Sequence, residues 1–131
     1  MSKEIPDYVE GHNLLAGKSV LITAAAGAGI GFSAAKRAVE EGARAVVISD
    51  VHEGRLNQAK DTLAELSSTC QVSAQLCDVT NEAQVQALVD FAEAETSGVD
   101  ILINNAGLGG SCRLTDMTDE AWSRVLDITL T

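Results

Sequence analysis

The 131-residue chain is poor in aromatic residues and has no long apolar run. Aromatic side chains make up 3% of the sequence, so the core is expected to be aliphatic. No apolar stretch approaches the roughly 20 residues that a membrane span requires. The N-terminus also lacks the apolar stretch of a signal peptide. We therefore expect no membrane partner and a cytoplasmic location.

Basic residues are also scarce. Nine Lys and Arg stand against 19 Asp and Glu, which gives a formal net charge of −10. Because a nucleic-acid surface needs a basic footprint, nucleic acid is excluded as a partner. Cys70, Cys77 and Cys112 are odd in number and form no Cys-x-x-Cys, so neither a disulfide framework nor a metal site is expected. We expect them to be small buried hydrophobes, and we place His12 and His52 at the surface.

Beyond residue 16, short apolar runs alternate with helical patterns. Residues 1–16 are expected to form an N-terminal arm, and residues 17–131 one folded domain. The expected strands are 19–23, 45–49, 71–77 and 99–103, and the expected helices are 30–41, 53–67, 81–96 and one that Thr118 caps. Gly42 is expected to stop the first helix, and Asn81 and Gln84 resemble a capping pair for the third. Two apolar faces are expected, one in the second helix at Leu56, Ala59, Leu63 and Leu66, and one in the last helix at Trp122, Val125, Leu126 and Thr129. This alternation predicts an α/β fold with a Rossmann-type, doubly wound parallel sheet. Right-handed crossovers then give the strand order 3-2-1-4.

A glycine-rich turn lies between the first strand and the first helix. It reads Thr23-Ala-Ala-Ala-Gly-Ala-Gly-Ile-Gly31. Such a turn brings the backbone close to a diphosphate and directs the first N–H groups of the helix at the negative charge. Phe32 stands where a Gly-x-Gly-x-x-Gly pattern needs its last glycine, so the prediction depends on context. That context is a strand before, a helix after, and Asp50 lying 19 residues beyond Gly31.

Two acids follow the second and third expected strands, at the sheet edge where ligands bind. A carboxylate at Asp50 can accept from both ribose hydroxyls of an adenosine and repels a 2′-phosphate, which favours NAD over NADP, although Arg55 is near in sequence. The alternative is an ordinary acid at a helix N-terminus. Asp78 either accepts from the adenine amino group or is a turn aspartate. After the fourth strand, in Asn104-Asn105-Ala-Gly107, one asparagine is expected to be structural and the other to lie against the ribose.

The chain resembles the first half of a classical short-chain dehydrogenase/reductase. The matching stretches are residues 21–31, 45–50, 77–79, 100–107 and 121–127, of which Asn104-Asn-Ala-Gly107 is the most specific. The resemblance implies hydride transfer between a nicotinamide cofactor and a secondary alcohol or ketone. It also implies a homotetramer or dimer packed through helices that begin near Glu120. The sequence of these motifs is further similar to that of an actinobacterial subgroup, which acts on acyl-CoA intermediates of steroid-ring breakdown. Within the family, the alternative is a 3-oxoacyl-thioester reductase.

The resemblance also implies which residues bind the cofactor. The adenosine contacts carry over to Asp50, Asp78 and Val79. The diphosphate contacts carry over to the turn, at Ala25, Gly27, Ala28, Gly29, Ile30 and Gly31. The ribose and nicotinamide contacts carry over to Asn105, Ala106 and Gly107.

Three departures from the family pattern stand out. Ala24 replaces the first glycine of Thr-Gly-x-x-x-Gly-Ile-Gly, and the turn is one residue longer. Thr129 stands where the family has an asparagine of the proton relay. The catalytic Tyr-x-x-x-Lys pair is missing, since Tyr8 is the single tyrosine and His12 follows it at the fourth place. We expect a truncated part of a longer enzyme, inactive alone. The alternative is a non-catalytic nucleotide-binding module.

Overall fold

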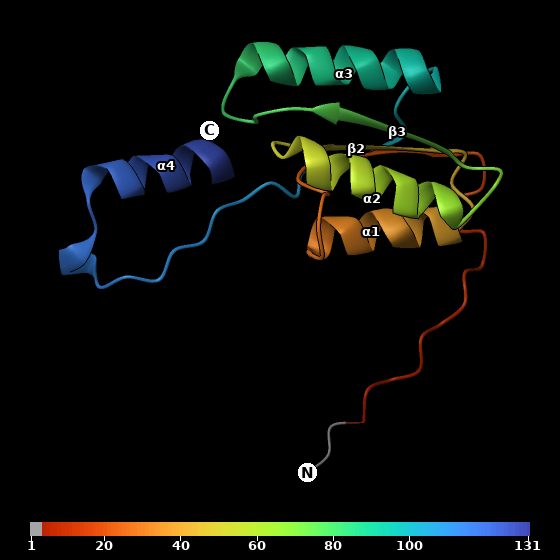
Figure 1. Ribbon diagram of the computed structural model, residues 1–131, viewed down its shortest axis with the longest axis horizontal. Coiled ribbons are helices and arrows are strands. Elements are labelled where there is room, and N and C mark those ends of the chain that lie inside the picture. The colour runs from red at the N-terminus through yellow and green to blue at the C-terminus, as the bar shows by residue number, and fades with distance from the viewer. Residues whose placement is uncertain (1–3) are drawn as a thin grey trace.

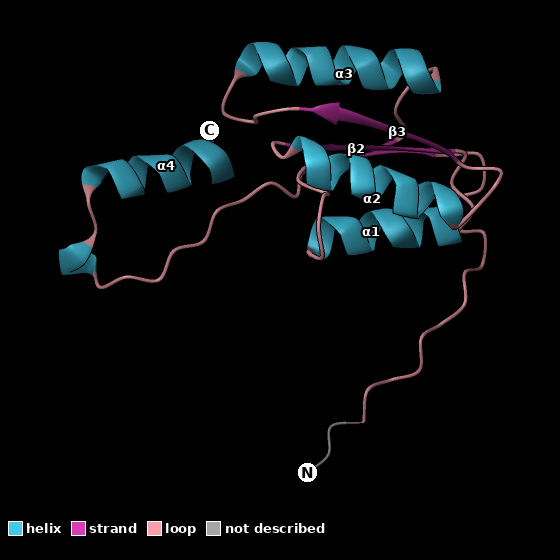
Figure 2. Cartoon of the chain, viewed as in Figure 1, coloured by secondary structure: helices cyan, strands magenta, loops and turns pink. Residues whose placement is uncertain are grey.

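The computed structural model describes residues 4–131, and it confirms the predicted fold class. The strands are β1 (Ser19–Ile22), β2 (Ala45–Asp50), β3 (Gln71–Leu76) and β4 (Ile101–Ile103). The helices are α1 (Ile30–Glu40), α2 (Glu53–Glu65), α3 (Glu82–Thr96) and α4 (Asp119–Thr129), with a 3₁₀ turn, η1, at Leu114–Asp116. All paired strands are parallel and their order is β3-β2-β1-β4. Figures 1 and 2 show the arrangement.

The sheet is covered on both faces, as a doubly wound fold requires. Helices α1 and α2 lie on one face and α3 on the other (Figure 1). Successive residues of β1 and β2 face opposite layers: Val20 and Ile48 pack under α1 and α2, whereas Leu21 and Val47 pack under α3. Both faces being buried explains why these strands are continuous apolar runs.

The ends of the helices follow the expected capping chemistry. Gly42 takes a φ of +78° directly after α1, and the Asn81 side chain accepts from the Gln84 N–H at 3.1 Å to start α3. The Gln84 side chain does not complete the reciprocal box, because its oxygen accepts from the Asp78 N–H at 2.9 Å instead. Thr118 caps α4 by accepting from the Ala121 N–H at 3.1 Å.

Several details differ from expectation, among them the start of β4 at Ile101 and not at residue 99. Helix α2 ends at Glu65, and Leu66, expected in its apolar stripe, is 42% exposed. Cys70 and Cys77 are buried, and burial raises the pKa of both thiols, but Cys112 is exposed on the surface loop before η1. Both histidines are exposed as predicted. Among residues 4–131, no helix combines the length and the apolar character that crossing a membrane requires.

Helix α4 stands apart from the two helical layers, on the side toward which β3 points (Figure 1). Trp122, Val125, Leu126 and Thr129 share one face of it, as their spacing predicts. That face is largely uncovered: Trp122 is 54% exposed and Leu126 37%. Periodicity therefore identifies the apolar face of α4, but no described residue buries it.

Residues 9–14 are held at the C-terminal end of α1. The Glu41 carboxylate accepts from the His12 and Leu14 N–H groups at 2.8 and 3.1 Å, and also binds the Arg37 guanidinium. Arg37 in turn donates to the carbonyls of Val9 and Glu10. One ion pair at the C-terminal end of α1 thus binds both N–H donors and carbonyl acceptors of residues 9–14.

We expect stability to fall at acid pH as the Glu41 network is protonated. The His12 and Leu14 N–H groups and Arg37 lower the pKa of Glu41 from its ordinary 4.5. A folded-state pKa below the unfolded value stabilises the fold fully above that ordinary range, and the contribution is lost as pH falls through the folded pKa. Urea unfolding from pH 7 to pH 3 should show Glu41→Gln less stable at pH 7, with a gap to wild type that closes in acid. The exposed Glu93→Gln should parallel wild type; a constant gap for Glu41→Gln would contradict this account.

Candidate functional site

The glycine-rich turn leaves β1 through backbone that favours glycine. Ala24, at the position of the family's first glycine, has a φ of +52°, and Gly27 has a φ of +92°. The left-handed region costs an L-residue about 1 kcal/mol, so Ala24 carries strain that glycine would avoid. The Ala25 N–H, fully buried, donates to the Ser49 carbonyl at 3.0 Å and holds the turn against β2.

The turn ends at the N-terminus of α1, which no side chain caps. Gly29 is the N-cap, with a φ of −88° and no side-chain hydrogen bond. In the described part of the chain, the N–H groups of Gly27, Ala28 and Gly29 donate to no protein acceptor. These amides, together with the first N–H groups of α1, form a surface suited to an anion such as a diphosphate.

Gly31 lets α1 and the strand ends come together. A Cβ built there would lie 2.5 Å from Asn105 Nδ2, 2.6 Å from the Ala24 carbonyl oxygen and 3.1 Å from Ala25 Cα. These neighbours are backbone atoms and a hydrogen-bonded amide, so none can move aside easily. The glycine at position 31 is required by packing whatever its part in cofactor binding.

Asp50 lies at the end of β2, next to the turn. Its Oδ2 accepts from the Ala26 N–H at 3.1 Å, and its Oδ1 accepts from the Val51 and His52 N–H groups at 2.8 and 3.2 Å. The acid is half-buried. It therefore joins the turn to the start of α2, and a carboxylate has lone pairs left for a ribose hydroxyl.

Asp78 and Val79 follow β3. Asp78 Oδ1 accepts from the Thr80 N–H at 2.9 Å and the Thr80 hydroxyl at 2.7 Å, and these bonds lower the pKa of Asp78. The bonds are those of a turn aspartate, which keeps the carboxylate ionised at neutral pH. Asp78 Oδ2 takes no part in the turn, so the geometry is compatible with both hypotheses for Asp78, a turn aspartate and an acceptor for the adenine amino group.

Thr23, Asn105 and Ala106 fasten the loop after β4 to the end of β1. The Thr23 hydroxyl accepts from the Asn105 and Ala106 N–H groups at 3.0 and 3.1 Å. Asn105 Nδ2 donates to the Thr23 and Ala24 carbonyls, both at 3.1 Å. Asn105 therefore has the structural role expected of one asparagine of the pair, while its Oδ1 takes part in none of these bonds and is left for the ribose contact that the family resemblance assigns to it. Thr23 ends the first expected strand, and a hydroxyl side chain at that place is the signal in the sequence for this role.

Thr129 holds the next part of the same loop. Its hydroxyl accepts from the Leu108 N–H at 3.1 Å and lies 3.4 Å from the Leu108 carbonyl. The hydroxyl thus bonds to the loop and not back to its own helix. Gly107 lies beneath it, because a Cβ there would sit 4.0 Å from the Thr129 methyl group.

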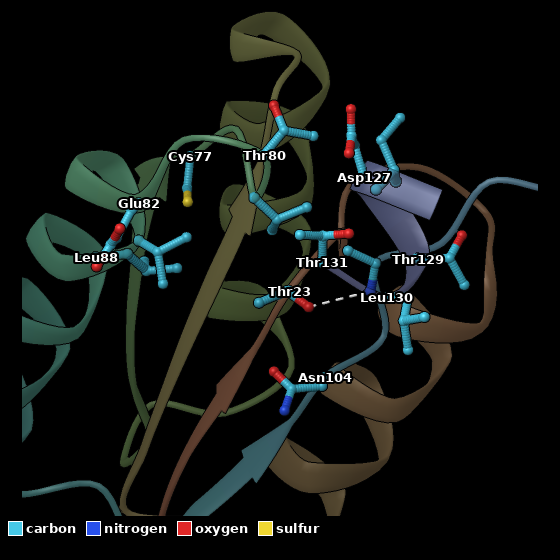
Figure 3. A pocket seen from close by; sticks show the side chains of 14 residues that line it. Thr23, Cys77, Thr80, Glu82, Leu88, Asn104, Asp127, Thr129, Leu130 and Thr131 are labelled. Atoms are coloured by element: carbon cyan, nitrogen blue, oxygen red, sulfur yellow. Dashed lines mark hydrogen bonds between the residues drawn. The ribbon is translucent and has the colours of Figure 1, made fainter. Parts of the chain in front are cut away.

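A cavity of about 590 Å³ opens at the carboxyl ends of the strands, between the start of α3 and the end of α4 (Figure 3). Val79, Ala106 and Thr129 line it, along with Thr23 and Asn104, which Figure 3 shows at the ends of β1 and β4. Thr23 is the one residue of the glycine-rich turn that lines it; residues 24–31 and Asp50 do not. The residues predicted to bind the cofactor thus all follow the carboxyl ends of the strands. The cavity lies beside only some of them, on the α3 side of the sheet.

Tyr8 lies far from this edge. Its hydroxyl donates to Glu40 at the last turn of α1, and its ring lies 5.4 Å from Lys36 Nζ. The 11 residues of α1 span about 16 Å, so the length of the helix separates this tyrosine from the glycine-rich turn. Tyr8 does not serve the candidate site.

The sequence matches the short chain dehydrogenase family over residues 18–131. Fold, turn and sequence agree, and the chain belongs to this family. A curated relative from Mycobacterium tuberculosis, "(5R,7aS)-5-hydroxy-7a-methyl-1-oxo-2,3,5,6,7,7a-hexahydro-1H-indene-carboxyl-CoA reductase", is 53% identical over 128 residues, which are 96% of this chain and 47% of that protein. A crystal structure of a short chain dehydrogenase from Mycobacterium smegmatis is 52% identical with a TM-score of 0.92, over 97% of this chain and 51% of that one.

Two further solved structures differ in their cofactor. An NAD⁺-bound xylitol dehydrogenase is 33% identical with a TM-score of 0.81, over 88% of this chain and 43% of that one. An actinorhodin polyketide ketoreductase with NADPH is 30% identical with a TM-score of 0.79, over 86% and 41%. The chain spans about half the length of the relatives it matches. The family binds nicotinamide cofactors, and these neighbours leave open which of the two this chain takes.

Proposed function

We propose that this chain is the cofactor-binding half of an NAD-dependent oxidoreductase. The observation that carries the proposal is the uncapped N-terminus of α1, reached through the turn at Gly27–Gly31, with the Asp50 carboxylate beside it at the end of β2. Amides suit the diphosphate, and the acid suits the two ribose hydroxyls of NAD while repelling the 2′-phosphate of NADP. Asp78, Val79, Asn105, Ala106 and Gly107 complete the proposed contacts.

The proposed substrate is a secondary alcohol or ketone carried on a thioester of coenzyme A, with a steroid-derived ring. The support is the 53% identity with the indene-carboxyl-CoA reductase, over nearly the whole of this chain. We expect the whole enzyme to act in the cytoplasm, where the free Cys70 and Cys77 would stay reduced. We expect it to associate as a dimer or tetramer through helices that include α4, whose apolar face is largely uncovered.

This chain alone is proposed to bind cofactor without catalysing the reaction. A short-chain dehydrogenase needs a tyrosine that exchanges a proton with the substrate oxygen, aided by a lysine that lowers its pKa. Tyr8, the single tyrosine, lies at the opposite end of α1 from the turn.

Calorimetric titration of the chain with NAD, NADP and ADP-ribose tests the proposal. We expect NAD and ADP-ribose to bind with similar affinity, because the adenosine and diphosphate make most of the contacts, and NADP to bind more weakly. Tighter binding of NADP would overturn the role given to Asp50, and failure of all three to bind would overturn the proposed site. Incubation with NAD and a hydroxyacyl-CoA should give no NADH; turnover would contradict the claim that the chain is inactive alone.

A further inference from the structure

The glycine-rich turn has one residue more than the family pattern, and two successive amides of its first half are held by β2. The Ala25 N–H bonds to the Ser49 carbonyl at 3.0 Å, and the Ala26 N–H bonds to Asp50 Oδ2 at 3.1 Å. Directly afterwards the backbone reverses at Gly27, with a φ of +92°. The bond from Ala26 to Asp50 is therefore the last one that holds an N–H group of the lengthened turn before the amides of residues 27–29, which have no acceptor among the described residues.

Asp50 is held in place from its other side. Oδ1 accepts from the Val51 N–H at 2.8 Å and from the His52 N–H at 3.2 Å, at the start of α2. The carboxylate thus bridges the start of α2 and the glycine-rich turn, where its partner Ala26 lies 24 residues before Asp50 in sequence. Hydrogen bonds to a charged acceptor are about twice as strong as neutral ones, so the bridge is a firm one.

We propose that Asp50 is a positioning residue for the glycine-rich turn, in addition to any contact with a ribose. Through Ala26 it fixes the lengthened turn before a ligand arrives and sets the direction of the Gly27–Gly29 amides. Its consequence for affinity rests on the proposed function, because ordering the turn in advance lowers the entropy lost on binding. The bridge itself exists without cofactor.

Only a carboxylate can accept hydrogen bonds on both sides of this bridge, so Asp50→Asn should break one side of it. Asparagine has one acceptor oxygen and one NH₂ group that only donates. In Asp50→Asn, one end must therefore place that NH₂ group against an N–H group, either of Ala26 or of Val51 and His52. Removing the charge to admit NADP would then loosen the turn and weaken binding of both cofactors.

Hydrogen exchange of the ligand-free chain tests this, since a ribose contact cannot affect a protein without ligand. In Asp50→Asn we expect exchange in peptides covering residues 23–31 to be about tenfold faster. Peptides from α3 should be unchanged, which shows that the loss of protection is local. Asp78→Asn is the matched control, because the Asp78 carboxylate bonds only within its own turn, and its 23–31 peptides should exchange as in wild type.

Unchanged exchange at 23–31 in Asp50→Asn would overturn the positioning role, and weaker NAD binding in the same variant would then leave Asp50 as a direct contact. Faster exchange in a chain whose wild type binds no NAD would keep the positioning role and reject the proposed function. Should Asp50→Asn not fold, amide exchange of the wild type, measured by NMR, decides. The Ala26 N–H should exchange about tenfold more slowly than the N–H of Gly27, which has no protein acceptor among residues 4–131, and equal rates would overturn the proposal.

Discussion

Gly31→Ala is expected to destabilise the fold by about 3 kcal/mol and to remove NAD binding. The added methyl group would lie 2.5 Å from Asn105 Nδ2 and 2.6 Å from the Ala24 carbonyl oxygen. These two groups are themselves bonded to each other at 3.1 Å, so either α1 moves away from the strand ends or that bond breaks. Both outcomes displace the turn and the loop after β4 together. Urea unfolding and calorimetric titration with NAD measure the two effects.

Substitutions at two other glycines distinguish an effect on packing from an effect on cofactor binding. Gly54 in α2 has nothing within 4 Å of a built Cβ, so Gly54→Ala should leave NAD binding intact and raise stability by about 0.5 kcal/mol. Gly29 also has open space around it, so Gly29→Ala should cost no more than about 1 kcal/mol, the difference between glycine and alanine at an N-cap. Its methyl group would, however, stand where the diphosphate is proposed to bind, and NAD affinity should fall. If Gly31→Ala were as stable as the wild type, the atoms around position 31 could move aside at little cost, and the packing role given to Gly31 would be wrong.

Much of this architecture follows from patterns close together in the sequence. Apolar runs that are buried on both faces, separated by amphipathic stretches, were enough to predict a parallel sheet with the order that β1 to β4 adopt. Capping is equally local, and Asn81 and Thr118 begin helices as predicted. The reciprocal bond of Gln84 could not be predicted, because the Asp78 N–H competes for its side chain only once β3 and α3 are placed.

The details of the site depend on contacts between distant segments. The two asparagines after β4 are adjacent and chemically identical, and the choice between them depends on carbonyls of Thr23 and Ala24, 81 or 82 residues away. Asp50 was expected to bind a ribose or a helix N-terminus, and neither expectation included its bond to Ala26. The spacing of α4 defined an apolar face, but periodicity does not say what covers that face. Composition alone suggested burial of all three cysteines, and a loop position left Cys112 exposed.

Thr23→Val is expected to lower the free energy of unfolding by about 3 kcal/mol. The residue is 7% exposed, and its hydroxyl is the acceptor for two N–H groups, those of Asn105 and Ala106. Valine has nearly the same shape, so the change leaves no cavity; it removes the acceptor and leaves two donors facing a methyl group. An unsatisfied buried donor costs about 1–3 kcal/mol, which sets the size of the effect.

Thr23→Ser is the matched control, because it deletes the methyl group and keeps the hydroxyl. We expect it to retain most of the stability that valine loses, and to keep slow hydrogen exchange at the Asn105 and Ala106 amides. In Thr23→Val those two amides should exchange fast while α3 stays protected, and NAD affinity should fall, since the loop that carries the proposed ribose contacts is no longer fixed to β1. The account is wrong if Thr23→Val is as stable as the wild type and Thr23→Ser is less stable than both. Thr23 would then act through its methyl group, and the Asn105 side chain alone would hold the loop after β4.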